Sequence, residues 1–127
     1  MRLRIAAAAG AFLAGVFLVC LGAASAAPAG KLAPNDIQST FFNGQPFTSS
    51  TPSQAITYKM VFGTDGTMTR EPQGKSGVKG EGNWKLSKDG FCTTWKNSPQ
   101  NCFTLVSGAD NKYSVMKGNT LVGIWSK

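Results

Sequence analysis

Short runs of alternating apolar and polar residues fill most of the chain from residue 55 to its end. In the clearest run, residues 55–62, the apolar positions recur at every second residue: Ile56, Tyr58, Met60 and Phe62. This period of two predicts a half-buried β-strand, because successive side chains of a strand point to opposite faces. The same reasoning predicts six more strands, at residues 67–70, 82–86, 91–95, 102–106, 112–116 and 120–126.

Turn residues separate these runs. Asp65-Gly66 and Asp89-Gly90 are Asp-Gly pairs, which are among the strongest short hairpin signals. Further turns are predicted at residues 97–101, 107–111 and 117–119. Short strands at a spacing of roughly ten residues predict an all-β fold, either a small antiparallel meander or a lipocalin-like barrel.

One segment beyond the N-terminal region has a helical signal. Asn35 is a candidate N-cap, with Gln38 three residues later to complete a capping box. A short helix would run to about Phe42 and end at Asn43-Gly44. Its apolar face would consist of Ile37, Phe41 and Phe42. The chain is therefore predicted to contain a single β domain, residues 35–127, that begins with one short helix.

The first 26 residues have the pattern of a secretory signal peptide. Arg2 and Arg4 precede an apolar run, Ile5–Leu21, and Ala24-Ser25-Ala26 supplies the small residues of a cleavage site. We therefore expect a periplasmic or secreted protein with no stable membrane span after cleavage. Residues 27–34, rich in alanine, proline and glycine, are predicted to be a flexible lead-in.

Two other interpretations of the apolar run are less favoured. A membrane anchor would be short, at 17 residues, and interrupted by Gly10 and Gly15. A lipoprotein signal needs small residues before its cysteine, whereas Leu18-Val19 precede Cys20. In either case Cys20 lies outside the predicted folded domain.

Charge and composition narrow the partners of the exported chain. Removing 26 of 127 residues leaves 101, and removing Arg2 and Arg4 leaves 11 of the 13 basic residues against 6 acidic ones, a net charge of +5. Ten of these cations are lysines, and Arg70 is the only arginine. Lysine is a well-hydrated point charge, whereas the arginine fork suits phosphates and bases. The charge thus favours solubility, and we expect no nucleic-acid partner.

Cys92 and Cys102 remain after cleavage and are symmetric about Asn97 in the sequence. A hairpin with its turn at Asn97 would place them opposite each other, and an even pair of cysteines in an oxidising compartment usually forms a disulfide. A metal site is the alternative. It is disfavoured because zinc needs three or four ligands and the chain contains no histidine.

Few residues are suited to catalysis. Without histidine, no Ser-His-Asp or Cys-His arrangement is possible. Four of the six acids lie in predicted turns or at the helix start, which leaves Glu71 and Glu81 beside a glycine-rich loop as a conceivable acid/base pair. Solvated loop glutamates are the favoured interpretation. We therefore expect no enzymatic activity, no catalytic residues, no metal and no cofactor.

Aromatic residues are the remaining candidates for a site. Tyr58, Trp84 and Trp95 are the candidate ligand-binding residues, and Trp95 stands at a hairpin end where it could line a barrel mouth. Core packing is the alternative for all three and is the favoured interpretation, because aromatic residues that alternate along strands are usually buried. For Trp95 this alternative means packing against the disulfide.

The order of tryptophan, glycine and cysteine residues resembles a known group of proteins. Gly82-x-Trp84, then Asp89-Gly90-Phe91-Cys92, Trp95 and Cys102-Phe103 is similar to a pattern in small secreted β proteins of Gram-negative bacteria that are classed as domains of unknown function. The resemblance covers roughly residues 35–127. It implies a lipocalin-like or half-barrel fold and periplasmic residence, and it implies no activity or catalytic residues.

Two functional hypotheses follow. The first is an exported, non-enzymatic binding protein of the bacterial envelope, monomeric, holding a small apolar ligand or an envelope component. The alternative is a protein-interaction module, such as a secreted enzyme inhibitor. The positive charge argues against lysozyme as the target, because lysozyme is itself basic. A cavity lined by alternate strand residues would favour the first hypothesis, and a filled core with an apolar rim of loops the second.

Overall fold

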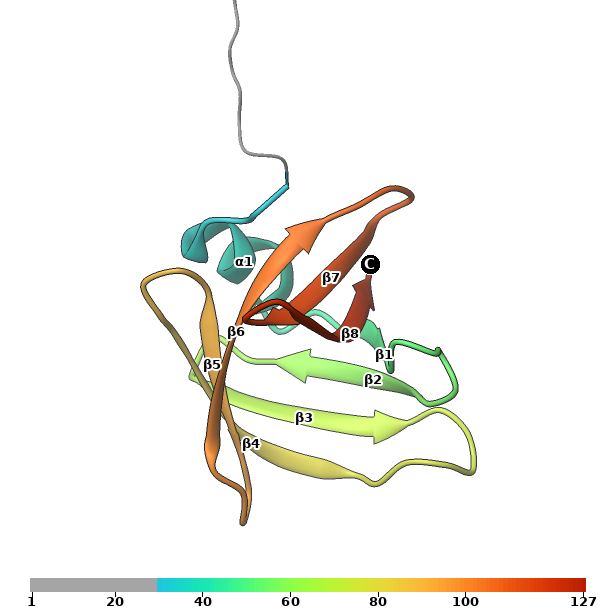
Figure 1. The fold of residues 1–127 in the computed structure, drawn as a ribbon. Helices are drawn as coiled ribbons and strands as arrows, with labels where there is room; N and C mark the ends of the chain where they lie inside the picture. The colour runs from blue at the N-terminus through green and yellow to red at the C-terminus, as the bar shows by residue number, and fades with distance from the viewer. Residues whose placement is uncertain (1–29) are drawn as a thin grey trace, which may run out of the picture.

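The structure is a computed structural model that describes residues 30–127. The predicted signal peptide, Cys20 and the first residues of the lead-in lie outside these described residues. Helix α1 (Pro34–Phe41) precedes eight strands that form a closed antiparallel barrel (Figure 1). The strands are β1 (Phe47–Ser50), β2 (Thr57–Phe62), β3 (Thr67–Pro72), β4 (Gly80–Leu86), β5 (Phe91–Trp95), β6 (Gln100–Ser107), β7 (Lys112–Lys117) and β8 (Thr120–Ser126).

The predicted fold class is confirmed, as a closed lipocalin-like barrel rather than an open meander. Each strand pairs with the next, and β1 pairs with both β2 and β8 to close the barrel. All seven predicted strands are present, and β5 and β8 have the predicted bounds. Strand β1 was not predicted, because Phe47 is its only apolar residue and three hydroxyl residues follow.

The predicted helix is confirmed, but its predicted cap is wrong. The N-cap is Ala33, which makes no side-chain cap hydrogen bond, and Asn35 lies inside the first turn. Pro34 begins the helix because its fixed φ suits the first helical position and its missing N–H would have had no partner there. Gly44, at φ +85°, follows the helix end and lets the chain turn back toward β1.

Helix α1 lies across one end of the barrel (Figure 1), which we call the helix end. Its predicted apolar face is confirmed, since Ile37, Phe41 and Phe42 are fully buried. The Phe42 ring lies 4.6 Å from the Phe62 ring and 4.6 Å from the Trp84 ring, measured between centroids. Aromatic pairs at such separations add to the stabilisation from burial. The helix therefore fills this end of the barrel with the core of the domain.

The predicted disulfide is confirmed. Cys92 and Cys102 are directly opposed in the β5–β6 hairpin and form a disulfide, and Asn97 in the connecting turn has a positive φ of 65°. Trp95 stands three positions after Cys92 on β5, so their side chains lie on opposite faces of the strand. Packing of Trp95 against the disulfide, one of the two interpretations of that residue, is therefore wrong.

Residues 30–32 belong to the segment that we predicted to be a flexible lead-in, but in the structure they pair with β6. The amide of Leu32 donates to the carbonyl of Leu105 at 2.8 Å, and the amide of Ser107 donates to the carbonyl of Gly30 at 2.7 Å. Lys31 forms the corresponding bridge with Val106. These hydrogen bonds tie the chain that leads into α1 to the barrel wall.

Candidate functional site

The end of the barrel opposite α1, which we call the mouth, contains an open cavity of about 290 Å³. The strand alternation places one side of each strand toward it: residues 58, 60 and 62 of β2, and residues 91, 93 and 95 of β5. The cavity is mainly apolar, with hydroxyl groups near its rim. Its lining consists of Ser49, Ser50, Thr51, Tyr58, Met60, Phe62, Arg70, Phe91, Thr93, Trp95, Phe103, Val115, Val122, Gly123 and Trp125.

Arg70 is the one charged residue in this lining. It follows the buried Met68 by two positions on β3 and pairs in register with the buried Met60, so it takes an inward position of the barrel. Its guanidinium carbon lies 4.6 Å from the centroid of the Trp95 ring and 5.1 Å from that of the Tyr58 ring. Both distances are within the range of cation–π attraction. The cation is therefore held between two aromatic rings at the mouth.

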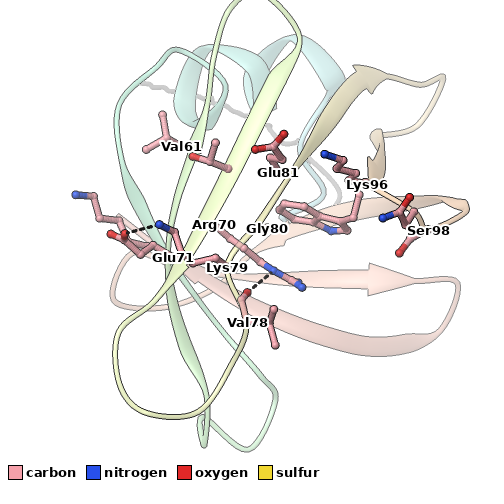
Figure 2. Close-up of a pocket in the computed structure, with 13 residues that line it drawn as sticks. Val61, Arg70, Glu71, Val78, Lys79, Gly80, Glu81, Lys96 and Ser98 are labelled. Atoms are coloured by element: carbon pink, nitrogen blue, oxygen red, sulfur yellow. Dashed lines mark hydrogen bonds and ion pairs between the residues drawn. The ribbon is translucent and has the colours of Figure 1, made fainter.

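A backbone contact orients the guanidinium. The Nε–H of Arg70 donates to the carbonyl oxygen of Val78 at 3.1 Å, in the loop between β3 and β4 (Figure 2). Gly80 leaves the space that this arrangement needs, because a Cβ atom there would lie 2.9 Å from Nε of Arg70 and 3.4 Å from Cε3 of Trp95. The absence of a side chain at Gly80 thus lets the Arg70 guanidinium and the Trp95 indole lie close to the backbone of β4.

No acidic side chain in residues 30–127 forms an ion pair with Arg70. The two glutamates flanking the β3–β4 loop are both exposed. Glu71 lies 3.9 Å from the Lys79 ammonium, and Figure 2 shows Glu71 and Glu81 pointing away from the guanidinium. The conceivable acid/base pair of Glu71 and Glu81 thus consists of surface groups, one of them next to a lysine, which leaves the Arg70 cation without a carboxylate partner.

Two buried residues of the cavity lining carry a polar group. Thr93 is 5% exposed and Trp125 is 4% exposed. Neither side chain hydrogen-bonds to another residue of the described part of the chain, whereas the Trp84 indole N–H donates to the Gly63 carbonyl at 2.8 Å. Buried polar groups are nearly always satisfied by protein, water or ligand. Water or a ligand atom in the cavity can therefore supply the partner that the described residues do not.

A second hollow, of about 810 Å³, lies on the outer face of β2, β3 and β4 beside the β5–β6 turn (Figure 2). Its outer wall mixes three lysines with two glutamates and is solvated, so it has no single charge preference: Lys59, Lys79, Lys96, Glu71 and Glu81. Arg70 and Trp95 line both hollows. The stacked pair therefore forms the wall between the outer groove and the cavity, where solvent can reach the cation.

The structure brings together two of the three candidate residues. Tyr58 and Trp95 lie on either side of Arg70 at the mouth, whereas Trp84 packs on Phe42 at the helix end. Thr93 and Arg70 were missed. The signal for Arg70 was its even spacing from Met68, which places both on one face of the strand. Arg70 stands only two residues before Pro72, however, and a charged residue at that position resembled the end of a strand.

Comparisons of this chain with protein-family models, with curated proteins and with solved structures found no match. The helix in residues 30–127 lacks the length and apolar character needed to cross a bilayer. The geometry of the mouth therefore carries the functional interpretation.

Proposed function

We propose that this protein is an exported, non-enzymatic binding protein of the bacterial envelope that holds a small apolar ligand in the mouth of its barrel. The observation that carries the proposal is the cavity lined by alternate residues of the strands, at the end that α1 leaves open. Ligand sites are typically concave, mostly apolar and equipped with a few polar groups. The mouth has each of these properties.

The size of the cavity limits the ligand. Its volume of about 290 Å³ is at the lower end of the range of roughly 300–1,000 Å³ that ligand pockets span. A ligand enclosed there is small, or it is a longer molecule of which only one part enters the barrel. Export is supported by the predicted signal peptide and by the disulfide, because disulfides persist in oxidising compartments.

The alternative function, a protein-interaction module such as an enzyme inhibitor, has weaker support. Among large apolar side chains of the described residues, Val78 is 68% exposed, and Leu121 and Val122 are each 38% exposed. Isolated exposed apolar residues are normal on a protein surface. An apolar rim of loops over a filled core would have favoured a protein partner, and the barrel instead has an open cavity.

A pair of tryptophan substitutions on β1 tests ligand binding. Ser49 lines the cavity, whereas the side chain of its neighbour Thr48 points to the opposite face of the strand. We expect the wild-type protein to bind N-phenylnaphthylamine, a neutral apolar fluorophore, and Ser49→Trp to block binding by filling the mouth. Thr48→Trp is the matched control and should bind normally. Equal binding by both variants, or no binding by the wild type, would contradict the proposal.

The native ligand and the compartment can be tested together. Native mass spectrometry of the protein isolated from its own envelope should show a bound small molecule, and N-terminal sequencing should show cleavage after Ala26. A stoichiometric protein partner in place of a small molecule would support the interaction module instead. An uncleaved N-terminus on the isolated protein would contradict export.

A further inference from the structure

Arg70 is a half-buried cation that the fold holds in place without an acidic partner among the described residues. Burying a charge is costly unless it is paired or hydrogen-bonded. Here the guanidinium has two aromatic faces and one backbone carbonyl, and no carboxylate within ion-pairing distance among residues 30–127. The site therefore lacks the counter-charge that a cation at the edge of an apolar cavity would normally have.

The hydrogen bonds of Arg70 show which part of the guanidinium is free. An arginine side chain has five N–H donors, of which Nε–H is one. Nε–H donates to Val78, and no side-chain hydrogen bond joins the two Nη groups to any described residue. These groups form the outer edge of the fork, whose geometry matches two oxygens of one carboxylate. The backbone contact thus orients Arg70 and leaves its bidentate edge available.

The other polar side chains of the cavity lining are uncharged. The indole of Trp125 only donates a hydrogen bond, the hydroxyl of Thr93 donates or accepts, and the lining contains no aspartate or glutamate. These groups can donate hydrogen bonds to acceptor atoms of a ligand, and none of them offers a cation a counter-charge. Arg70 thus places a positive charge beside an apolar wall, a combination that favours an amphipathic anion over a cation.

We propose that the ligand is a small amphipathic monoanion, with a carboxylate head at Arg70 and an apolar tail in the barrel. This inference rests on the proposed function and names its ligand class. A single charge is favoured because Arg70 is the only cation that lines the cavity, whereas Lys59, Lys79 and Lys96 line the outer groove. The head lies at the wall shared with that groove, and the small cavity favours a short tail.

Three probes with the same tail and different heads test the charge preference. Decanoate is anionic, decanol is neutral and decyltrimethylammonium is cationic, and each is titrated against protein-bound N-phenylnaphthylamine. Hydrogen bonds to a charged group are strong enough that we expect decanoate to bind roughly 10- to 100-fold more tightly than decanol. Decyltrimethylammonium should bind least. Decyl phosphate, a fourth probe, separates a carboxylate from a phosphate head, and its tighter binding would overturn the carboxylate assignment.

Two variants test whether Arg70 causes the preference. Arg70→Met removes the charge and keeps an apolar side chain, so decanoate should lose its roughly 10- to 100-fold advantage while decanol binding persists. Gly80→Ala keeps the arginine but places a methyl group 2.9 Å from its Nε, so the guanidinium must shift and the advantage should fall. Lys96→Met, which removes a cation of the outer groove, is the matched control and should change decanoate affinity by less than about threefold.

The outcomes separate this inference from the function on which it rests. If decanoate and decanol bind equally, or if Arg70→Met keeps the preference for decanoate, the anion site is wrong while apolar ligand binding stands. If the wild type binds neither the fluorophore nor any amphiphile, both the function and the inference are wrong. Thermal melts identify a variant that has lost its fold, and Gly80→Ala then decides the role of Arg70 without removing its charge.

Discussion

The two ends of the barrel are built from the same strands and differ in how tightly their interiors are packed and in whether their polar groups have partners. At the helix end, Phe42 stacks on Phe62 and packs against Trp84, and the Trp84 N–H has a backbone partner. At the mouth, Arg70 has aromatic neighbours but no carboxylate, and the hydroxyl of Thr93 has no partner among the described residues. A filled interior stabilises a fold, while an interior with unmatched polar groups is suited to a ligand. The difference supports the proposal that the mouth serves recognition, while the packing of the helix end stabilises the fold.

The largest effect should come from the helix end. Phe42→Ala removes a fully buried ring that pairs with four other aromatic side chains, and truncations of this kind cost about 3–5 kcal/mol. Urea denaturation measures the loss. Tyr58→Ala at the mouth is the comparison, and it should cost less than half as much because Tyr58 is only half-buried. Equal costs would contradict the division between the two ends.

Removing the disulfide should lower stability and leave recognition intact. The Cys92–Cys102 bond closes a loop with a sequence separation of 10, for which the chain-entropy model predicts about 2–3 kcal/mol of stabilisation. The double variant Cys92→Ser, Cys102→Ser should therefore unfold at lower urea concentration than the wild type. Because Cys92 faces away from the cavity, binding of N-phenylnaphthylamine below the unfolding transition should be unchanged. A loss of binding in the folded double variant would show that the hairpin shapes the mouth.

Arg70→Met should have a small effect on stability, in contrast to its effect on ligand preference. The variant loses two cation–π contacts, each worth about 0.5–1 kcal/mol at solvent-exposed sites. It also removes a half-buried cation that has no carboxylate partner among the described residues, which offsets part of this loss. We expect the unfolding free energy to change by less than about 1 kcal/mol, measured by urea denaturation. A loss as large as that of Phe42→Ala would mean that Arg70 is a structural residue of the barrel.

The smallest effect should come from the β2–β3 turn, and it should depend on pH. The side chain and amide of Thr67 both donate to the Asp65 carboxylate, at 2.6 and 3.1 Å, and these hydrogen bonds lower the pKa of Asp65. A lowered pKa in the folded state stabilises the protein above the unfolded pKa of about 3.9, and the stabilisation is lost as the pH falls through the lower folded value. Asp65→Asn should therefore lower the melting temperature slightly at neutral pH.

At strongly acidic pH, Asp65→Asn and the wild type should melt at nearly the same temperature, because the wild-type carboxyl is then protonated. Thr67→Val removes the hydroxyl donor and provides the control. In that background the effect of Asp65→Asn at neutral pH should shrink. A difference between Asp65→Asn and the wild type that grows as the pH falls would show that Asp65 does not act through its carboxylate.

How far the sequence predicts this protein depends on the range of the interactions involved. The seven predicted strands, the Asp-Gly turns and the Cys92–Cys102 register depend on local period, turn chemistry and symmetry about one hairpin, and the structure contains all of them. Asn35 was assigned as a cap from spacing alone. The structure instead begins the helix at Pro34, because a proline suits the first helical position and the capping box competed with it.

The features that only the tertiary structure establishes depend on residues far apart in the chain. β1 has a weak apolar pattern and exists as a strand because β2 and β8 supply hydrogen bonds on both of its edges. The site requires barrel closure, which brings Tyr58 of β2 and Trp95 of β5 to the two sides of Arg70. The sequence by itself determined the strands and the turns between them. Which interior end is filled by α1 and which stays open as a mouth is a property of the closed barrel, since no local pattern encodes the contents of an enclosed volume.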